Sequence, residues 1–317
     1  MINCKVCECQ INELSFNLLF DDRYGYPGLF KLFKCKNCGH RELEGKFTAE
    51  MLLTLYSEYY PRSAARLEDY KPYKKVSGFY GWLDGIYSMS FRWVPKNVIV
   101  LDIGCGFGET LGYHSERGCV VYGVEADKNI QRVAEKFGFN VHVGLFDPNI
   151  YKPDFFDYVT MDQVIEHVTD PVITLRGIYK VLKPGGYAVL SLPNPSGWGA
   201  RLFGKRWVSW HVPYHLQHFS IASMSIAAEK AGFTIEKYKT ITNALWLYYQ
   251  WMHCITFPEE GKPSAFWSSK TKLSSYHFVF MRINNLMHKS KINHLITRVF
   301  DALKLGDNYI FILRKPK

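Results

Sequence analysis

The sequence contains no stretch of apolar residues that is long enough, and free enough of polar side chains, to predict a membrane span. The long uncharged run 240–258 includes Thr, Asn, Gln and His, so we expect a buried or interfacial helix there. The first ten residues, MINCKVCECQ, are polar and rich in cysteine and lack the apolar core of a secretory leader. We therefore expect a cytoplasmic protein.

An excess of positive charge is missing from the first two thirds of the chain. Residues 1–200 contain 22 Lys and Arg against 23 Asp and Glu, whereas residues 201–317 contain 17 against 6. The formal net charge of +10 therefore arises entirely in the last third. Such a basic region favours an anionic partner: phospholipid headgroups at the inner membrane face, a phosphate-bearing substrate, or nucleic acid. A contribution to solubility alone is the competing explanation.

Four of the eight cysteines form two CxxC pairs, Cys4 with Cys7 and Cys35 with Cys38. A CxxC turn presents two thiolates to one tetrahedral ion, and disulfides are not expected in a reducing compartment. A module this small buries too little surface to fold without further stabilisation. The spacing predicts a zinc-ribbon-like module over residues 1–46 with one structural zinc, while a redox or nucleic-acid-reading role is the alternative.

From residue 97 onward, apolar strands alternate with helical segments. Strands are expected at the start of NVIVLDIGCGFG, in CVVYGVEAD, NVHVGLF and FFDYVTMD, and in GGYAVLSLPN. This alternation is typical of a doubly wound α/β fold with a parallel sheet, in which ligands bind at the carboxyl ends of the strands.

The first of these strands ends in a glycine-rich turn that lacks the G-x-G-x-x-G spacing of dinucleotide-binding enzymes. Its glycines are Gly104, Gly106 and Gly108, which permit a sharp turn and close approach of a ligand to the backbone. Glu125 ends the next strand, 21 residues after Gly104, where a carboxylate can accept hydrogen bonds from both hydroxyls of a ribose.

Four motifs in order, VLDIGCGFG, GVEAD, DYVTMDQVIEHV and LKPGGYAVLSLPN, resemble the class I S-adenosylmethionine-dependent methyltransferases over about residues 98–233. Together with the CxxC module, the chain also resembles a bacterial subgroup that acts mainly on sugars and other small molecules. The resemblance implies a seven-stranded Rossmann-like sheet. It implies three segments: the zinc-ribbon-like module 1–46, a helical linker and cofactor lid over 47–96, and a methyltransferase domain over 97–317.

The resemblance also implies roles for the matching positions. These are Asp102, Gly104, Cys105 and Gly106 at the methionine end of the cofactor, Glu125 with Ala126 at the ribose, Leu145 and Phe146 near the adenine, Gln163 near the methyl group, and Tyr60 in the lid. Family members often carry an acid directly after the glycine of the third motif, where this chain has GLFD; Asp147 or a backbone group would replace it. By composition alone, Tyr60 belongs to an ordinary aromatic helix face.

The region after the fourth strand lacks the Asn/Asp-Pro-Pro-aromatic tetrad with which methyltransferases of this class typically methylate the amino group of adenine or glutamine. The chain has DQVIEH there, which disfavours a base or amide nitrogen as the acceptor.

Strands are also expected at TIEKYKTI and NYIFILRKP, and the usual short hairpin between them is replaced by residues 242–306. This insertion is rich in aromatic residues and lysine, so it is not expected to be disordered. It is interpreted either as a lid that grips an amphipathic acceptor, such as a lipid-linked saccharide, or as a helical cap or dimer contact.

Histidines supply the candidate bases, because an alcohol or carbon acceptor must lose a proton. His167 follows the fourth strand and is expected to open a helix, while His211, His215 and His218 lie in HVPYHLQHFS. Three explanations stay open for the trio: a metal site, acceptor-site chemistry, or packing. We predict that His215 and His218 belong to the acceptor side of the active site, not to a metal, with Tyr214 and Phe219 as apolar anchors.

The sequence therefore predicts a methyltransferase that acts on a hydroxyl or carbon of a sugar, glycan or other small-molecule acceptor, including lipid- or phosphate-linked forms. An RNA methyltransferase is the alternative suggested by the zinc ribbon and the basic last third, although no RNA-binding module is recognisable. A non-catalytic cofactor-binding module is a further alternative, disfavoured by the intact glycines and Glu125.

Overall fold

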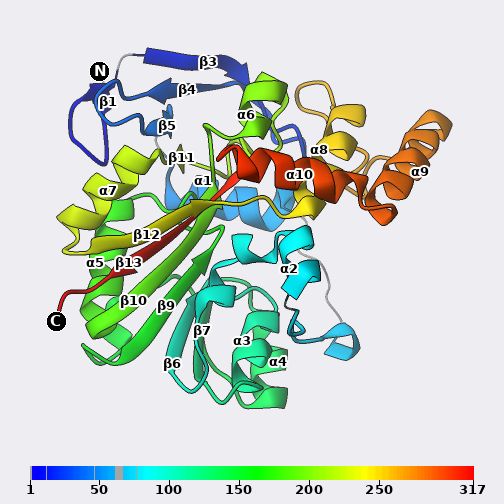
Figure 1. Ribbon diagram of the computed structural model, residues 1–317. Coiled ribbons are helices and arrows are strands. Elements are labelled where there is room, and N and C mark those ends of the chain that lie inside the picture. The colour runs from blue at the N-terminus through cyan, green and yellow to red at the C-terminus, as the bar shows by residue number, and fades with distance from the viewer. Residues whose placement is uncertain (1, 12, 46, 61–66, 77) are drawn as a thin grey trace.

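The computed structural model describes residues 2–11, 13–45, 47–60, 67–76 and 78–317, and a seven-stranded sheet forms its centre (Figure 1). The order of its strands is β12-β13-β10-β9-β6-β7-β8. Only β13 runs antiparallel to its neighbours. The strands are β6 (Ile99–Ile103), β7 (Val120–Glu125), β8 (Asn140–Val143), β9 (Phe156–Asp162), β10 (Leu182–Pro193), β12 (Thr234–Thr240) and β13 (Asn308–Arg314). This confirms the predicted Rossmann-like fold class.

Helices cover both faces of the sheet, as a doubly wound fold requires. The α-helices are α1 (Ala49–Thr54), α2 (Gly78–Asp84), α3 (Glu109–Ser115), α4 (Ile130–Phe137), α5 (Pro171–Val181), α6 (Trp198–Phe203), α7 (Ile221–Lys230), α8 (Ala244–Ile255), α9 (Ser275–Lys289) and α10 (Ile292–Ala302). Short turns are the π-helical η1 (Leu55–Tyr59) and the 3-10 turns η2 (Leu67–Asp69), η3 (Ile86–Ser88), η4 (Ser90–Trp93), η5 (Pro148–Ile150) and η6 (Gly204–Arg206).

The central sheet holds two of the four apolar clusters among the described residues, one on each side. The larger core contains Leu175 and Ile178 of α5 and Met224 of α7. The smaller core contains Leu111 of α3 and Val133 of α4. The strands between them are apolar on both faces, which is why the central segments are almost continuous runs of Val, Ile and Leu.

The amino-terminal module is a second, smaller sheet that includes a strand from the main domain. Its order is β11-β5-β4-β3, and a separate hairpin pairs β1 with β2. These strands are β1 (Ile2–Asn3), β2 (Gln10–Ile11), β3 (Glu13–Leu19), β4 (Phe30–Lys34), β5 (Arg41–Leu43) and β11 (Gln217–His218). Because Gln217 pairs with Glu42 and His218 with Arg41, the sheet extends beyond the predicted segment 1–46.

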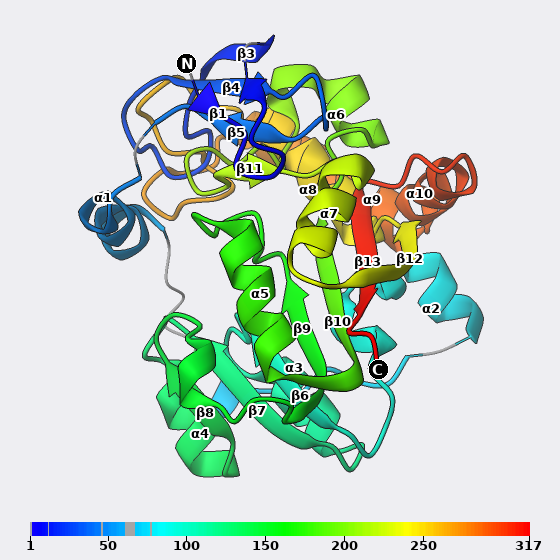
Figure 2. The same ribbon diagram turned by 90° about the vertical axis from the view of Figure 1, so that its left-hand side faces the viewer.

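The module lies at the end of the central sheet toward which β9 and β10 point (Figures 1 and 2). Figure 2 shows β5 and β11 above the upper ends of these strands, with the chain's carboxyl terminus at the lower end of β13. The module therefore covers the edge at which ligands bind in parallel α/β sheets.

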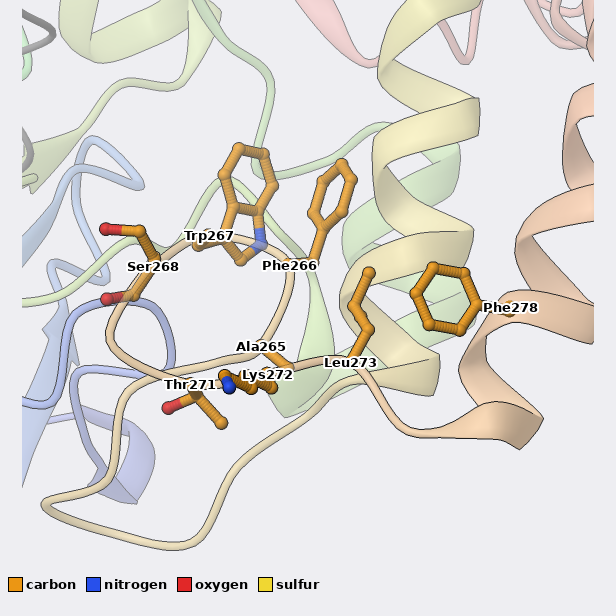
Figure 3. Close-up of a pocket in the computed structure, with 9 residues that line it drawn as sticks. Ala265, Phe266, Trp267, Ser268, Thr271, Lys272, Leu273 and Phe278 are labelled. Atoms are coloured by element: carbon orange, nitrogen blue, oxygen red, sulfur yellow. The ribbon is translucent and has the colours of Figure 1, made fainter.

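The insertion before the last strand consists of α8, α9 and α10 and the loop that joins α8 to α9. Helix α8 corresponds to the uncharged run of the sequence, and Leu247 and Met252 on it are buried. Among the described residues, no helix is long and apolar enough to cross a membrane. The insertion also forms an open pocket, where Phe266 and Trp267 lie side by side and Leu273 lies beside Phe278 (Figure 3).

Candidate functional site

The glycine-rich turn after β6 forms a cradle that is tight on one side and open on the other. Gly104, Gly106 and Gly108 have φ angles of +76°, +58° and +86°, which favour glycine. A Cβ atom on Gly104 would lie 2.5 Å from Cγ2 of Val164, whereas one on Gly106 would meet no described atom within 4 Å. The backbone at Gly106 is therefore accessible to a ligand, as the predicted methionine end of the cofactor requires.

Glu125 at the end of β7 holds this turn in place. Its Oε2 accepts a hydrogen bond from the backbone N–H of Gly106 at 2.9 Å, and Oε1 accepts one from that of Asp127 at 2.9 Å. Each carboxylate oxygen has a second lone pair that can accept a hydroxyl proton. Glu125 is thus placed to hold both the turn and a ribose, which stays a prediction.

Asp102 and Cys105 turn their side chains into the protein. Asp102 is 2% exposed, and its carboxylate accepts hydrogen bonds from the hydroxyls of Thr160, at 2.6 Å, and Thr110. Burial raises the pKa of Asp102 to about 7. The Cys105 thiol is also buried. Both side chains support the turn from inside, so a ligand at this position meets the backbone of the turn; their predicted contact with the cofactor is untested.

The next two strand ends carry the residues predicted near the ribose and the adenine. Ala126 is exposed directly after β7. Leu145, after β8, is 83% exposed, and this leaves its side chain free to pack against a ring. Phe146 packs instead toward Gly177 of α5, and Asp147 caps η5 by accepting from the N–H of Asn149. Of Ala126, Leu145, Phe146 and Asp147, the residue with a large exposed apolar side chain is Leu145.

Gln163 begins a polar network at the carboxyl end of β9. Its backbone has a φ of +55°, and its Nε2 donates to Oγ of Ser191 at 3.0 Å and to Oδ1 of Asn308 at 2.8 Å. Gln163 and Asn308 line a small cavity together with Ser209, Thr242, Trp246 and Asp307. The network fixes the amide at the strand end where the methyl group was predicted.

Next to this network, four histidines and one glutamate form a cluster. The ring centroid of His215 lies 4.6 Å from that of His167, 4.9 Å from His211 and 5.8 Å from His218. Glu166 is fully buried beside them. The sequence predicted the histidines as candidates. Their proximity to Glu166 comes from the fold, because the loop after β9 and the segment around residue 215 are distant in the sequence but in contact in the structure.

The cluster is buried deeply enough to suppress charge. Burial raises the pKa of Glu166 to about 8, and it lowers the pKa of His167 to about 4. Burial also holds the pKa values of His211, His215 and His218 well below the usual range. The imidazoles are therefore neutral at physiological pH, which is the form that a base or a metal ligand requires.

The environments of the predicted bases differ. His167 was expected to open a helix, but it lies in the turn before α5, which begins at Pro171; that expectation was wrong because Asp170 provides the N-cap by accepting from the N–H of Ile173. His167 is half-buried. His218 is 1% exposed and packs against Trp210, with ring centroids 4.9 Å apart.

Aromatic residues from three parts of the chain surround the cluster. Tyr60 packs against Tyr24, Tyr56 and Tyr214, with centroids 5.2 to 5.6 Å apart. The hydroxyl of Tyr56 lies 2.9 Å from Nδ1 of His167. Burial, followed by the charges of Tyr60, Glu166 and Glu125, raises the pKa of Tyr56. Tyr60, predicted to cover the cofactor, therefore packs beside the histidines, and residues 61–66 of the predicted lid lie outside the described residues.

Tyr24 comes from the amino-terminal module and was missed by sequence reasoning. Its turn is held by Asp21, whose carboxylate accepts from the backbone N–H groups of Arg23, Tyr24 and Tyr26 at 2.9 to 3.0 Å. An acid followed by glycine and proline in DDRYGYPG was the available signal for such a turn.

The four predicted metal ligands of the module come together. The Sγ atoms of Cys4 and Cys38 are 3.6 Å apart, those of Cys7 and Cys35 are 3.4 Å apart, and all four thiols are free. A tetrahedron with Zn–S bonds of 2.3 Å has edges of about 3.8 Å. The donor set and its spacing thus fit a structural zinc ion.

Comparison with known proteins places the chain in a family. A profile described as a methyltransferase domain matches residues 58–238, more than half of the chain. A ubiquinone biosynthesis O-methyltransferase of Pseudomonas fluorescens is 26% identical over 187 residues, which cover 53% of this chain and 81% of that protein. One of Aeromonas salmonicida is 29% identical over 149 residues, which cover 43% and 63%. The solved structure of Haemonchus contortus phosphoethanolamine N-methyltransferase 2 in complex with S-adenosyl-L-methionine is similar, with 23% identity, a TM-score of 0.46, and coverage of 76% of this chain and 53% of that one. The match over residues 58–238 shows that the chain belongs to the methyltransferase domain family, and this confirms the S-adenosylmethionine-dependent methyltransferase indicated by its sequence motifs.

Proposed function

We propose that this protein transfers the methyl group of S-adenosylmethionine to a hydroxyl oxygen, or an activated carbon, of a small-molecule acceptor such as a sugar or glycan. One observation carries the proposal: a glycine cradle held by Glu125 and a cluster of neutral histidines both follow the carboxyl ends of parallel strands of the same sheet. The hydroxyl of Tyr56 contacts His167 of this cluster.

The chain's residues divide into two functional groups. Glu125 and the backbone at Gly106 hold the cofactor, whose sulfonium makes its methyl carbon electrophilic. A neutral imidazole of His167, His215 or His218 would take the proton that the acceptor hydroxyl loses as its oxygen bonds to that carbon, while the carbon–sulfur bond breaks and S-adenosylhomocysteine leaves. Gln163 keeps a fixed amide beside the reacting groups.

A hydroxyl acceptor is favoured over a carbon acceptor by the relatives. The relatives from Pseudomonas fluorescens and Aeromonas salmonicida are named ubiquinone biosynthesis O-methyltransferases, and the matches cover 53% and 43% of this chain. The absence of the Asn/Asp-Pro-Pro-aromatic tetrad from the sequence after β9 also disfavours an amide or base nitrogen.

A lipid-linked acceptor and a peripheral membrane contact are part of the proposal. The basic last third and a set of exposed apolar side chains support them. These side chains are Phe79, Tyr80 and Trp82 of α2 and Tyr276, Phe278, Val279, Phe280, Ile283 and Leu286 of α9. Amphipathic surfaces with nearby basic residues bind anionic bilayers. Sedimentation with vesicles containing phosphatidylglycerol, but not with purely zwitterionic vesicles, is the expected result.

The proposed activity is tested by measuring cofactor binding and methyl transfer separately. S-adenosylhomocysteine should bind in calorimetry, and labelled methyl groups should pass from S-adenosylmethionine to at least one hydroxylated acceptor among sugars, nucleotide sugars and phenols. His167→Gln should slow transfer at least 100-fold while the affinity for S-adenosylhomocysteine changes less than threefold. His142→Gln, on β8, is the matched control. Transfer to nitrogen alone, or cofactor binding without transfer to any acceptor, would contradict the proposal.

A further inference from the structure

The carboxyl group of Glu166 is buried without a hydrogen-bond partner. The side chain is 1% exposed, and neither oxygen has a partner within the described part of the chain. Nε2 of His215 lies 3.9 Å from Oε1, which is too long for a hydrogen bond. Since buried polar groups are almost always paired, this carboxylate indicates a partner that comes from outside the chain.

The two histidines beside Glu166 are oriented by the backbone. Nδ1 of His215 lies 2.9 Å from the carbonyl oxygen of Ser209, and Nδ1 of His167 lies 2.9 Å from that of Tyr214. A carbonyl only accepts, so each Nδ1 carries the proton and each Nε2 keeps its lone pair. Metal-binding histidines typically donate the N–H of the other ring nitrogen to a neighbouring acceptor in this way, which fixes the tautomer and the direction of the ring.

We propose that Glu166, His167 and His215 bind a divalent transition-metal ion, in addition to the zinc held by the four cysteines. One ligand atom of each residue lies within 4.8 Å of those of the other two. Bonds of 2.0–2.1 Å place tetrahedral ligand atoms about 3.3 Å apart. His215 and Glu166, 3.9 Å apart, therefore need to approach by about 0.6 Å, and any pair at the 4.8 Å limit of the cluster by about 1.5 Å. Two imidazoles and one carboxylate suit zinc, iron or manganese and leave coordination positions open.

The proposed ion adds a chemical role to the site of the proposed function. This role rests on the proposed function, because it requires that the acceptor be a hydroxyl. An open position beside half-buried His167 can take the acceptor hydroxyl oxygen. Coordination would lower the pKa of a bound hydroxyl, so that its proton would be lost to solvent near neutral pH. With the ion bound, His167 and His215 would hold the metal, and this route would replace the direct transfer of the proton to an imidazole given in the proposed function. The acceptor class that gains most from such a site carries a second oxygen next to the reacting hydroxyl.

The proposed metal site is tested by measuring the uptake of metal ions, and this measurement does not depend on methyl transfer. Full-length protein that retains the cysteine-bound zinc is freed of exchangeable metal and titrated with zinc chloride and, separately, cobalt chloride. We expect one further equivalent, with a cobalt spectrum that has no sulfur-to-metal charge transfer. Glu166→Gln and His215→Gln should weaken this equivalent at least 100-fold, whereas His142→Gln should leave it unchanged. Uptake of no second equivalent, or unchanged uptake by folded Glu166→Gln and His215→Gln proteins, overturns the inference.

Methyl transfer separates this inference from the proposed function. A second ion that binds as expected in a protein that methylates no oxygen would overturn the proposed function alone. Methyl transfer at the wild-type rate by protein that takes up no second ion would overturn the metal site alone. Loss of transfer after removal of the exchangeable ion, and recovery when zinc or manganese is returned, is the result expected if both hold.

Discussion

Replacement of Glu125 by Ala should separate the two tasks of this carboxylate. The change removes the hydrogen bonds that it accepts from Gly106 and Asp127, both at 2.9 Å. At about 1 kcal/mol net for each bond, the unliganded protein should lose about 2 kcal/mol of unfolding free energy. Loss of two charge-assisted bonds to the ribose should weaken S-adenosylhomocysteine binding by about 2–3 kcal/mol, which is roughly 30- to 150-fold.

Glu125→Gln provides the intermediate case, because one carbonyl oxygen remains while the amide N–H₂ faces a backbone N–H. We expect about half of each effect. Urea unfolding measures the first quantity and isothermal titration calorimetry the second. Glu135→Gln, on the exposed surface of α4, controls for the loss of one negative charge.

The contribution of the ribose is isolated by comparing adenosine with 2′-deoxyadenosine as ligands. Wild-type protein should bind 2′-deoxyadenosine more weakly by about 1 kcal/mol or more. The Glu125→Ala protein should no longer discriminate between them. If it discriminates as strongly as the wild type, or if its affinity for S-adenosylhomocysteine is unchanged, the carboxylate serves only the turn and the reasoning fails.

Three further perturbations follow from buried groups. Cys38→Ser should lower the zinc content, measured by elemental analysis, from one tightly held ion to less than 0.2 per chain and reduce stability by roughly 3 kcal/mol or more; full zinc retention would refute the ligand assignment. Burial holds the pKa of His114 at about 3, whereas the unfolded ring titrates near 6.5, so lowering the pH from 7.5 to 5.5 should cost about 1.4 kcal/mol through this ring. Urea titrations of His114→Leu at both pH values should show a pH dependence smaller by that amount, and an unaltered dependence would show that the ring titrates normally. Gly104→Ala should destabilise by roughly 2–4 kcal/mol, from the contact with Val164 and the positive φ, and the added Val164→Ala change should restore part of this; no recovery would place the strain elsewhere.

The fold was predictable because its sequence signals are local. Apolar runs bounded by Gly, Asp or Glu defined β6 and β7, and the two strands expected around residues 234–241 and 308–316 became β12 and β13. The insertion 242–306 was interpreted as a lid or a helical cap, and it contains the helices α8, α9 and α10. Each of these features depends on neighbours in the sequence, and a parallel sheet of this kind has few alternative orders once its motifs are identified.

The site was only partly predictable because its side-chain directions depend on distant partners. His215 and His218 were predicted to face the cleft together, but pairing of His218 with Arg41 places its ring against Trp210. The tautomer of His215 depends on the carbonyl of Ser209, and no sequence pattern indicates that contact. Tyr214 and Phe219 were predicted as apolar anchors, and both are fully buried.

The pairing of β11 with β5 limits where this chain can be cut and which of its segments can be exchanged between relatives. Gln217 bonds His40 of the second cysteine turn at 3.2 Å and the carbonyl of Val168 at 2.7 Å, and the Ser220 hydroxyl donates to the carbonyl of Cys38. A cut after residue 46 would leave β5 on one piece of the chain and its pairing partner β11 on the other. Recombination that exchanges the cysteine module between relatives can succeed only when the matching segment near residue 217 is exchanged with it. The cysteine module and the segment near residue 217 are therefore expected to change together in evolution, although about 170 residues of sequence separate them.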